Sequence, residues 1–206
     1  MRAPAEQRVV LQNVSWETYE RLLAEIVDSA GTRFTYDEGS LEITVVSFAH
    51  ENPNRTLAYL VEIVAEETAR DLFRAGSTTF KRKDLAKGFE PDSCFYIDHA
   101  EQVRGKEELD LVTDPPPDLV IEVDITRSSL SRFPIFAALG VPEVWRFDGD
   151  RVTMHRLERG RYAPIEASLA LPPLTASQST IFLDESRHEK STVWLSRVRE
   201  WVRRAI

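Results

Sequence analysis

Residues 118–125 have the sequence DLVIEVDI. This stretch gives the clearest indication of the fold. Leu119 to Val123 form an almost continuous apolar run, which is typical of a central strand covered on both faces. Glu122 interrupts the run. A carboxylate on such a strand costs several kcal/mol unless a cation, a hydrogen-bond network or a proton compensates for its burial. The stretch therefore predicts a central strand and a polar site on it.

The acidic side chains around this strand favour a metal site. Because strand side chains alternate, Asp118, Glu122 and Asp124 share one face, and a divalent cation would relieve their mutual repulsion. Oxygen ligands of this kind suit Mg²⁺ or Mn²⁺. Asp92 follows Pro91 and begins a second predicted strand, 92–97. If the two strands pair, Asp92 approaches Glu122, and one metal bound by both could activate water and stabilise charge on a phosphate.

Upstream, the hydrophobic pattern predicts a helix from Trp16 to about Asp28 capped by Ser15. A β-hairpin follows, with strands 33–37 and 41–48. A long helix is predicted to begin with Asn52 as N-cap and Pro53 in its first turn, and to end before Gly76.

Downstream, further periodic segments predict a strand at 77–81, a helix at about 131–139, a hairpin of 143–148 with 151–157, and an amphipathic helix at about 186–205. From the long helix onward the order is α-β-β-β-α-β. This order predicts an α/β (α+β) fold in which a mixed sheet is flanked by helices, with an additional N-terminal helix and hairpin and a C-terminal helix. We expect one domain over 1–206, with its core at about 50–157.

Composition limits the classes of function. The chain has 206 residues, of which 42% are hydrophobic and 29% charged, with a net charge of −8 and a pI near 5.1. No segment has the length of a bilayer-spanning helix or a signal peptide, so we expect a cytoplasmic protein without a membrane partner. The acidic charge disfavours tight, non-specific DNA binding unless a local basic strip or a metal offsets it. The single cysteine, Cys94, excludes an intramolecular disulfide and a Cys-based zinc site.

The acidic pattern also resembles a known signature. Pro91-Asp92, followed thirty positions later by Glu122-Val123-Asp124, resembles the PD…(D/E)xK motif of restriction-endonuclease-like nucleases. Three longer segments, EPDSCFYI, PPPDLVIEVDIT and FAALGVPEVWRFD, resemble the Uma-type restriction endonuclease family. The resemblance extends from about Leu11 to Leu157, and more weakly to Phe182.

The resemblance implies a restriction-endonuclease-like fold in which Asp92 and Glu122 bind Mg²⁺ or Mn²⁺. It places the superfamily's lysine two residues after Glu122, where this chain has Asp124. In the Uma-type family the lysine moves to the following helix, and the position that aligns best is Arg132. Arginine keeps the positive charge and grips phosphate but does not accept a proton.

Three functions follow from the residues and the resemblance. The first is a Mg²⁺-dependent endonuclease that hydrolyses phosphodiester bonds of a nucleic acid, with DNA expected, and in which Arg132 steadies charge on the phosphate. The second is a catalytically impaired module of the same fold that binds nucleic acid or a protein. The third is a structural homo-oligomer, such as a homodimer, built through the C-terminal helix.

Several residues keep a structural alternative. Glu122 could form an ion pair with one of Arg127, Arg132 and Arg146. Asp124 could be an extra ligand or pair with Arg132, and Asp92 could cap a strand entry.

Other polar residues are equally open. His50 could be structural or belong to the site, and Glu62 and Glu66 could line the site or face solvent. The basic cluster Lys81, Arg82, Lys83 and Lys87 could bind phosphate or be an ordinary charged loop.

Overall fold

The computed structural model of this chain describes residues 6–26, 31–125 and 130–206. In these residues the chain forms two β-sheets and six α-helices. The strands are β1 (Glu6–Leu11), β2 (Thr32–Asp37), β3 (Ser40–Val46), β4 (Phe73–Arg74), β5 (Phe80–Arg82), β6 (Lys87–Phe89), β7 (Ser93–Tyr96), β8 (Leu119–Val123), β9 (Glu143–Phe147), β10 (Val152–Glu158) and β11 (Arg161–Ile165). The helices are α1 (Trp16–Glu25), α2 (Phe48–Glu67), α3 (Ala100–Val103), α4 (Phe133–Ala138), α5 (Ala176–Glu185) and α6 (Ser191–Ala205).

The larger sheet confirms the predicted mixed α/β fold. Its order is β11-β10-β9-β8-β7-β4, with β8 and β9 parallel and the other neighbours antiparallel. Along the chain, α2, β7, β8, α4 and β9 follow the predicted order. The strand predicted at 77–81 is wrong: β5 covers only its end and belongs to the second sheet, and β4, the edge strand of the six-stranded sheet, lies in the segment predicted to be helical. The central strand β8 is buried along its whole length. This is because helices cover one of its faces and the second sheet covers the other.

The second sheet was not foreseen as a sheet. The predicted hairpin, β2 and β3, is joined by β1 on one side and by β6 and β5 on the other, in the order β1-β3-β2-β6-β5. On one face, Phe34, Tyr36 and Leu41 pack against Trp16 and Tyr19 of α1. The opposite face carries Glu42 and Thr44, which are buried although they are polar. These two residues are important for the site described below.

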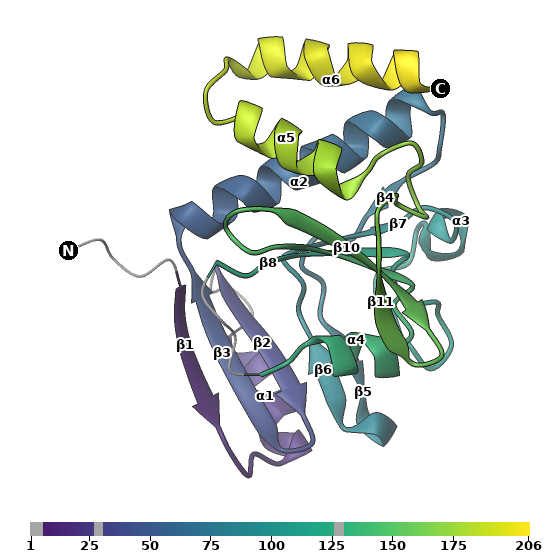
Figure 1. Cartoon of the computed structure of the whole chain (residues 1–206). Helices are drawn as coiled ribbons and strands as arrows, with labels where there is room; N and C mark the ends of the chain where they lie inside the picture. The colour runs from purple at the N-terminus through teal and green to yellow at the C-terminus, as the bar shows by residue number, and fades with distance from the viewer. Residues whose placement is uncertain (1–5, 27–30, 126–129) are drawn as a thin grey trace, which may run out of the picture.

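The chain forms layers around the six-stranded sheet (Figure 1). The helices α2, α5 and α6 lie together on one side, and α4 and the five-stranded sheet lie on the other. Two hydrophobic clusters fill the space on the two faces of β8, one through Leu119, Ile121 and Val123 and the other through Val120. Neighbouring residues of one strand therefore contact different layers, which is why the strand reads as a continuous apolar run.

Helix α2 begins and ends earlier than predicted. Asn52 is not its N-cap: the helix starts at Phe48, because the carbonyl of Ser47 accepts hydrogen bonds from the N–H groups of His50 and Glu51, both at 3.0 Å. Pro53 therefore lies inside the helix, where its missing N–H leaves one carbonyl of the preceding turn without its helical partner. The helix ends at Glu67, well before Gly76, because Ala69 adopts a left-handed φ of 54°.

The amphipathic helix predicted at the C-terminus is present, but its predicted start was wrong. The expected helix at 186–205 begins at Ser191, and a separate helix, α5, precedes it. Trp194 is buried and donates a hydrogen bond to the carbonyl of Phe182 at 2.8 Å, so α6 docks on its own domain. The strands β1 and β11 were also not predicted; both lie at the edges of their sheets, where a strand needs only one apolar face. The end of the first predicted helix, Asp28, lies outside the described residues.

Gly88 gives a first testable prediction about the packing of the five-stranded sheet. A Cβ atom at Gly88 would lie 2.4 Å from the hydroxyl oxygen of Tyr19. That ring is fully buried and stacked on Tyr36, with centroids 4.8 Å apart, so it has little room to move. We expect Gly88→Ala to lower the free energy of unfolding by about 1–3 kcal/mol, the usual cost of overpacking. Urea denaturation measures this, and an unchanged midpoint would contradict the packing described.

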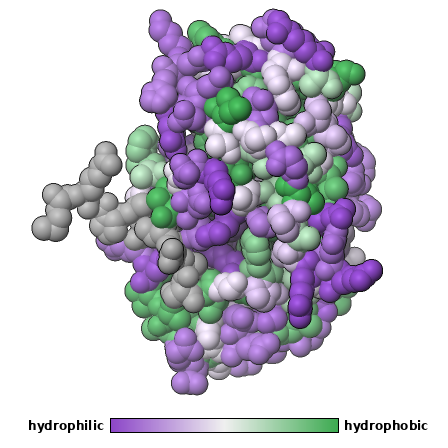
Figure 2. All heavy atoms as spheres, viewed as in Figure 1, coloured by the Kyte–Doolittle hydropathy of each residue, from purple (hydrophilic) through white to green (hydrophobic). Residues whose placement is uncertain are grey.

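The surface shows one apolar area on the five-stranded sheet. Figure 2 shows apolar side chains gathered at the lower left, where β1 lies in Figure 1, and Val9, Leu11 and Val45 of β1 and β3 are exposed. Within the described residues, no helix combines the length and the apolar character needed to cross a bilayer.

Candidate active site

Asp92 and Glu122 lie on the same face of two adjacent strands. In the antiparallel pair β7–β8, Ser93 is opposite Ile121, so one further step of the register places Asp92 opposite Glu122. Both side chains are nearly inaccessible, with residue exposures of 5% and 4%. Directly opposed residues in a sheet have Cβ atoms about 5 Å apart. The tertiary structure therefore brings together the two carboxylates that the sequence singled out.

Asp92 is held in one orientation by donors from two elements. Its Oδ2 accepts a hydrogen bond from the backbone N–H of Val123 at 2.7 Å and lies 3.1 Å from Nε2 of His50, at the start of α2. Asn54, one turn further along α2, donates to the backbone carbonyl of Asp92 at 3.2 Å. Burial alone would raise the pKa of Asp92, but the hydrogen bond and charge of His50, with the charge of Arg132, lower it below its ordinary value.

Glu122 has a different environment. Its Oε2 accepts a hydrogen bond from Arg132, which precedes α4, whereas its Oε1 is buried and has no hydrogen-bond partner among the described residues. Burial raises the pKa of Glu122 from its ordinary value of 4.5 to about 7; the charge of Arg132 works in the opposite direction, and the charge of Asp92 raises it further. A buried acid oxygen without a partner is costly, so this atom marks a place where a cation or a proton is favoured.

A third carboxylate, Glu42 of β3, was missed by the sequence reasoning. It is fully buried, and its Oε1 lies 3.6 Å from Nη2 of Arg132 and 3.9 Å from Nη1 of Arg8. The available signal was its place between Leu41 and Ile43, which puts Glu42 on the polar face of an alternating strand. That pattern normally indicates a solvated face. Only the packing of one sheet against the other buries it.

Asp124 is held by two arginines. Its Oδ1 accepts from Arg8 at 3.1 Å and its Oδ2 from Arg146 at 2.7 Å. In the described contacts it is thus paired with neither Arg132 nor a lysine. Of the three partners considered for Glu122, Arg132 is the one found; Arg146 contacts Asp124 instead, and Arg127 lies outside the described residues.

The other acidic candidates have partners elsewhere. Asp118 accepts the backbone N–H groups of Ile97 and His99 at 2.7 and 3.0 Å, so it orders the entry to its strand. Glu62 pairs with Arg74 at 2.8 Å, and Glu66 pairs with Arg199 of α6 at 2.8 Å.

The basic cluster before β7 is largely neutralised. Lys81 contacts Glu20 at 3.0 Å and Lys83 contacts Glu17 at 3.5 Å, both on α1. Arg82 and Lys87 also pair with acidic side chains. These lysines and the arginine therefore offer little uncompensated positive charge.

The residues fit a divalent cation at one point. Restriction-endonuclease-like families generally use divalent metals, and Asp92 and Glu122 offer hard oxygen ligands of the kind that Mg²⁺ and Mn²⁺ prefer. The oxygen of Glu122 that has no hydrogen-bond partner supports this fit. In the described parts of the chain, no cluster of three or more His, Cys, Asp or Glu side chains is arranged to hold a metal, so two carboxylates are the protein ligands on offer.

Burial of Glu122 makes stability depend on pH in a defined direction. The pKa of Glu122 is raised to about 7 in the folded chain. Between pH 4.5 and 7, Glu122 is therefore protonated in the folded chain and ionised in the unfolded chain. The contribution of Glu122 to stability is therefore complete below pH 4.5 and declines as the pH rises to 7, by up to about 3 kcal/mol. We expect urea unfolding with EDTA to show this loss in the wild type and not in Glu122→Gln. Parallel pH profiles for the two proteins would contradict the buried, protonatable state of Glu122.

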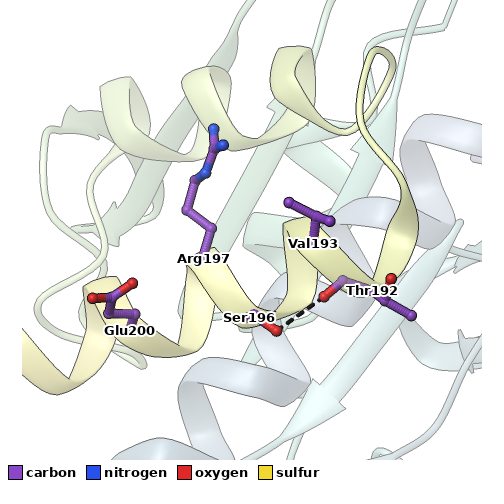
Figure 3. A pocket seen from close by; sticks show the side chains of 5 residues that line it. All are labelled: Thr192, Val193, Ser196, Arg197 and Glu200. Atoms are coloured by element: carbon purple, nitrogen blue, oxygen red, sulfur yellow. Dashed lines mark hydrogen bonds between the residues drawn. The ribbon is translucent and has the colours of Figure 1, made fainter.

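A shallow hollow lies elsewhere, on the outer face of α6 (Figure 3). It is lined by Thr192, Val193, Ser196, Arg197 and Glu200. Arg197 pairs with Glu185 and Glu189 at 3.2 and 2.5 Å, and the hollow contains none of the predicted site residues. Its shape alone does not indicate a ligand.

The mixed sheet flanked by helices and the two buried carboxylates agree with the restriction-endonuclease-like fold expected from the sequence. More specifically, the profile of the Uma2 family matches residues 16–183, so the chain belongs to this family, which is described as "putative restriction endonuclease". Among solved structures, the chain is similar to a "putative nuclease belonging to DUF820" from Anabaena variabilis, with 14% identity and a TM-score of 0.49 over 73% of this chain and 90% of that one. No curated protein matches the chain significantly.

Proposed function

We propose that this chain is a metal-dependent endonuclease that hydrolyses phosphodiester bonds of DNA. The observation that carries the proposal is the pair Asp92, directly before β7, and Glu122 of the adjacent β8, both buried, with one oxygen of Glu122 lacking a hydrogen-bond partner in the part of the chain that the structure describes. A Mg²⁺ or Mn²⁺ ion bound there would supply an activated water molecule and offset charge on the reacting phosphate. Membership of a restriction endonuclease family supports a nucleic acid as the substrate.

The residues around the pair have distinct tasks in this proposal. His50 and the N–H of Val123 keep Asp92 ionised and fix its orientation, which reduces the entropy lost when a ligand binds. The guanidinium of Arg132 remains charged, since Glu122, Asp92 and Glu42 raise its pKa against the effect of burial. A planar guanidinium grips phosphate oxygens in pairs, so Arg132 is a phosphate-binding group and not a proton acceptor.

Because the net charge of the chain is −8, binding of a nucleic acid requires a local region of positive charge. Arg8, Arg132 and Arg146 lie among the acidic side chains Glu42, Glu122 and Asp124, which pair with them, so a bound divalent cation would supply the uncompensated positive charge at the site. The side chain of Arg146 is 40% exposed, against 12% for Arg132 and 11% for Arg8, so it is the most accessible of these three arginines.

Cleavage of supercoiled plasmid DNA, titrated with Mg²⁺ or Mn²⁺, tests the proposal. We expect nicked and linear products that depend on the cation and are suppressed by EDTA. A single-stranded RNA of matched length distinguishes the two nucleic acids, and cleavage of the RNA alone would overturn the choice of DNA. Equal cleavage with EDTA would overturn the metal dependence.

A specific observation favours a second function, a binding module that has lost catalysis. The position of the superfamily's lysine is taken by Asp124, which is already paired with Arg8 and Arg146. Binding of DNA or Mn²⁺ without cleavage under any of these conditions would favour this second function.

A further inference from the structure

Arg132 lies between two carboxylates that belong to different sheets. Its Nη1 donates to Glu122 of β8, and its Nη2 lies 3.6 Å from Oε1 of Glu42 and 3.5 Å from Oγ1 of Thr44, both on β3. The side chain of Arg132 is only 12% exposed, and that of Glu42 is fully buried. The fork of a guanidinium suits this double contact, because its nitrogens can face two acids at once.

Arg132 holds Oε2 of Glu122, and the proposed metal would bind the same carboxylate through Oε1. A guanidinium bonded to Glu122 and a divalent cation on Glu122 would repel each other at such short range. Removing Arg132 without a replacement would leave Glu42, Asp92 and Glu122 buried with too little positive charge, which is strongly unfavourable. The two cations are therefore alternatives as the counter-charge of one carboxylate, and Glu42, 3.6 Å from Nη2 of Arg132, offers Arg132 a second partner within a short movement.

We propose that Arg132 is an internal counter-cation that competes with the divalent metal for Glu122, and that Glu42 is the partner to which it moves when the metal binds. This inference rests on the metal site of the proposed function. It assigns a role to Glu42, a positioning residue that acts through Arg132. It also couples metal occupancy to the contact between the two sheets, because Arg132 then holds β3 more closely.

Binding of Mn²⁺ to the full chain tests the inference without any activity measurement. Free Mn²⁺ is counted by its paramagnetic resonance signal, and the thermal midpoint is recorded with EDTA and with Mn²⁺. We expect Arg132→Met to lower the thermal midpoint in EDTA and to show a larger rise of the midpoint with Mn²⁺. We also expect it to bind Mn²⁺ about tenfold more tightly, a change of the usual size for coupled charged groups in contact. We expect Glu42→Gln to weaken Mn²⁺ binding about fivefold, because Arg132 loses its second partner.

The double variant Arg132→Met/Glu42→Gln separates a positioning role from direct ligation. We expect the effect of Glu42→Gln to vanish once Arg132 is removed; an effect that persists would make Glu42 a metal ligand and overturn its assigned role. Glu143→Gln, a buried carboxylate on β9 with partners of its own, is the matched control and should leave Mn²⁺ affinity unchanged.

Two further outcomes keep the test decisive. Unchanged or weaker Mn²⁺ binding by Arg132→Met would overturn the competition while leaving the metal site of the proposed function intact. Absence of Mn²⁺ binding in every variant, the wild type included, would overturn both. If Arg132→Met does not fold, Arg132→Lys replaces it: one ammonium cannot face both acids as the guanidinium does, so Glu42→Gln should have less effect in that background, and an undiminished effect would contradict the inference.

Discussion

Asp92→Asn and Glu122→Gln are each expected to reduce cation-dependent cleavage of plasmid DNA by about three orders of magnitude, since a catalytic metal contributes several kcal/mol to stabilising the transition state. Each amide keeps the shape of the acid but removes the negative charge that binds the cation. Asp92, directly before β7, and Glu122 of β8 are both buried, and the register of the two strands places them opposite one another. Each would supply its own oxygen to the cation, so neither can substitute for the other. Initial cleavage rates at several Mn²⁺ concentrations measure the effect.

The chain offers a matched control for each variant. Asp118 also follows a proline, is also buried and also accepts backbone N–H groups, yet its partners lie at the other end of β8. Glu143 lies on the strand next to Glu122 and is equally inaccessible. We expect Asp118→Asn and Glu143→Gln to retain cleavage at a temperature at which both remain folded. Substantial cleavage by Asp92→Asn or Glu122→Gln would refute the assigned site.

Glu143→Ala is expected to have the largest effect on stability, lowering the free energy of unfolding by about 3–5 kcal/mol. Glu143 accepts three hydrogen bonds: from Nε1 of Trp145 at 2.6 Å, and from the backbone N–H groups of Leu169 and Ala170, both at 2.9 Å. Alanine would leave these donors in a buried region without an acceptor. The bonds also fix the segment that leads from β11 to α5, so its order depends on them.

Urea denaturation followed by tryptophan fluorescence measures this loss. Glu143→Gln keeps one carbonyl acceptor and should cost about half as much as Glu143→Ala. A cost below about 1 kcal/mol for the alanine variant would show that these hydrogen bonds contribute little to the folded state.

Comparison of Glu143 with Glu122 explains why burial alone does not identify a site. Glu122 lies within β8 and Glu143 begins β9, both next to apolar residues, and both are almost inaccessible. Glu143 has donors on both of its oxygens, whereas Oε1 of Glu122 has no partner among the described residues. The first is a structural acid whose burial is compensated, and the second is an acid whose burial calls for a cation or a proton. The strand sequences alone do not distinguish them, because two of the three donors to Glu143, the N–H groups of Leu169 and Ala170, come from a distant segment.

The sequence predicted helices and strands correctly where a single hydrophobic period, that of a helix or of a strand, extends over many residues. The apolar run of β8, the stripe of α2 and the hairpin of β2 and β3 are of this kind, since each element buries a face defined by its own geometry. Boundaries were less predictable: Pro53 suggested a helix start, but the carbonyl of Ser47 begins the helix earlier. The edge strands β1 and β11 bury little and left a weak pattern.

The central strand, its acid at Glu122 and a second acid at Asp92, next to a neighbouring strand, could be predicted from the sequence, because alternation along a strand is a local property. The charges that compensate these two acids follow from the tertiary structure alone. His50 reaches Asp92 from α2, and Arg132 connects Glu122 to Glu42 across two sheets. Such pairings depend on the distances between elements far apart in the chain, and the low polarity of the space between the sheets makes them strong.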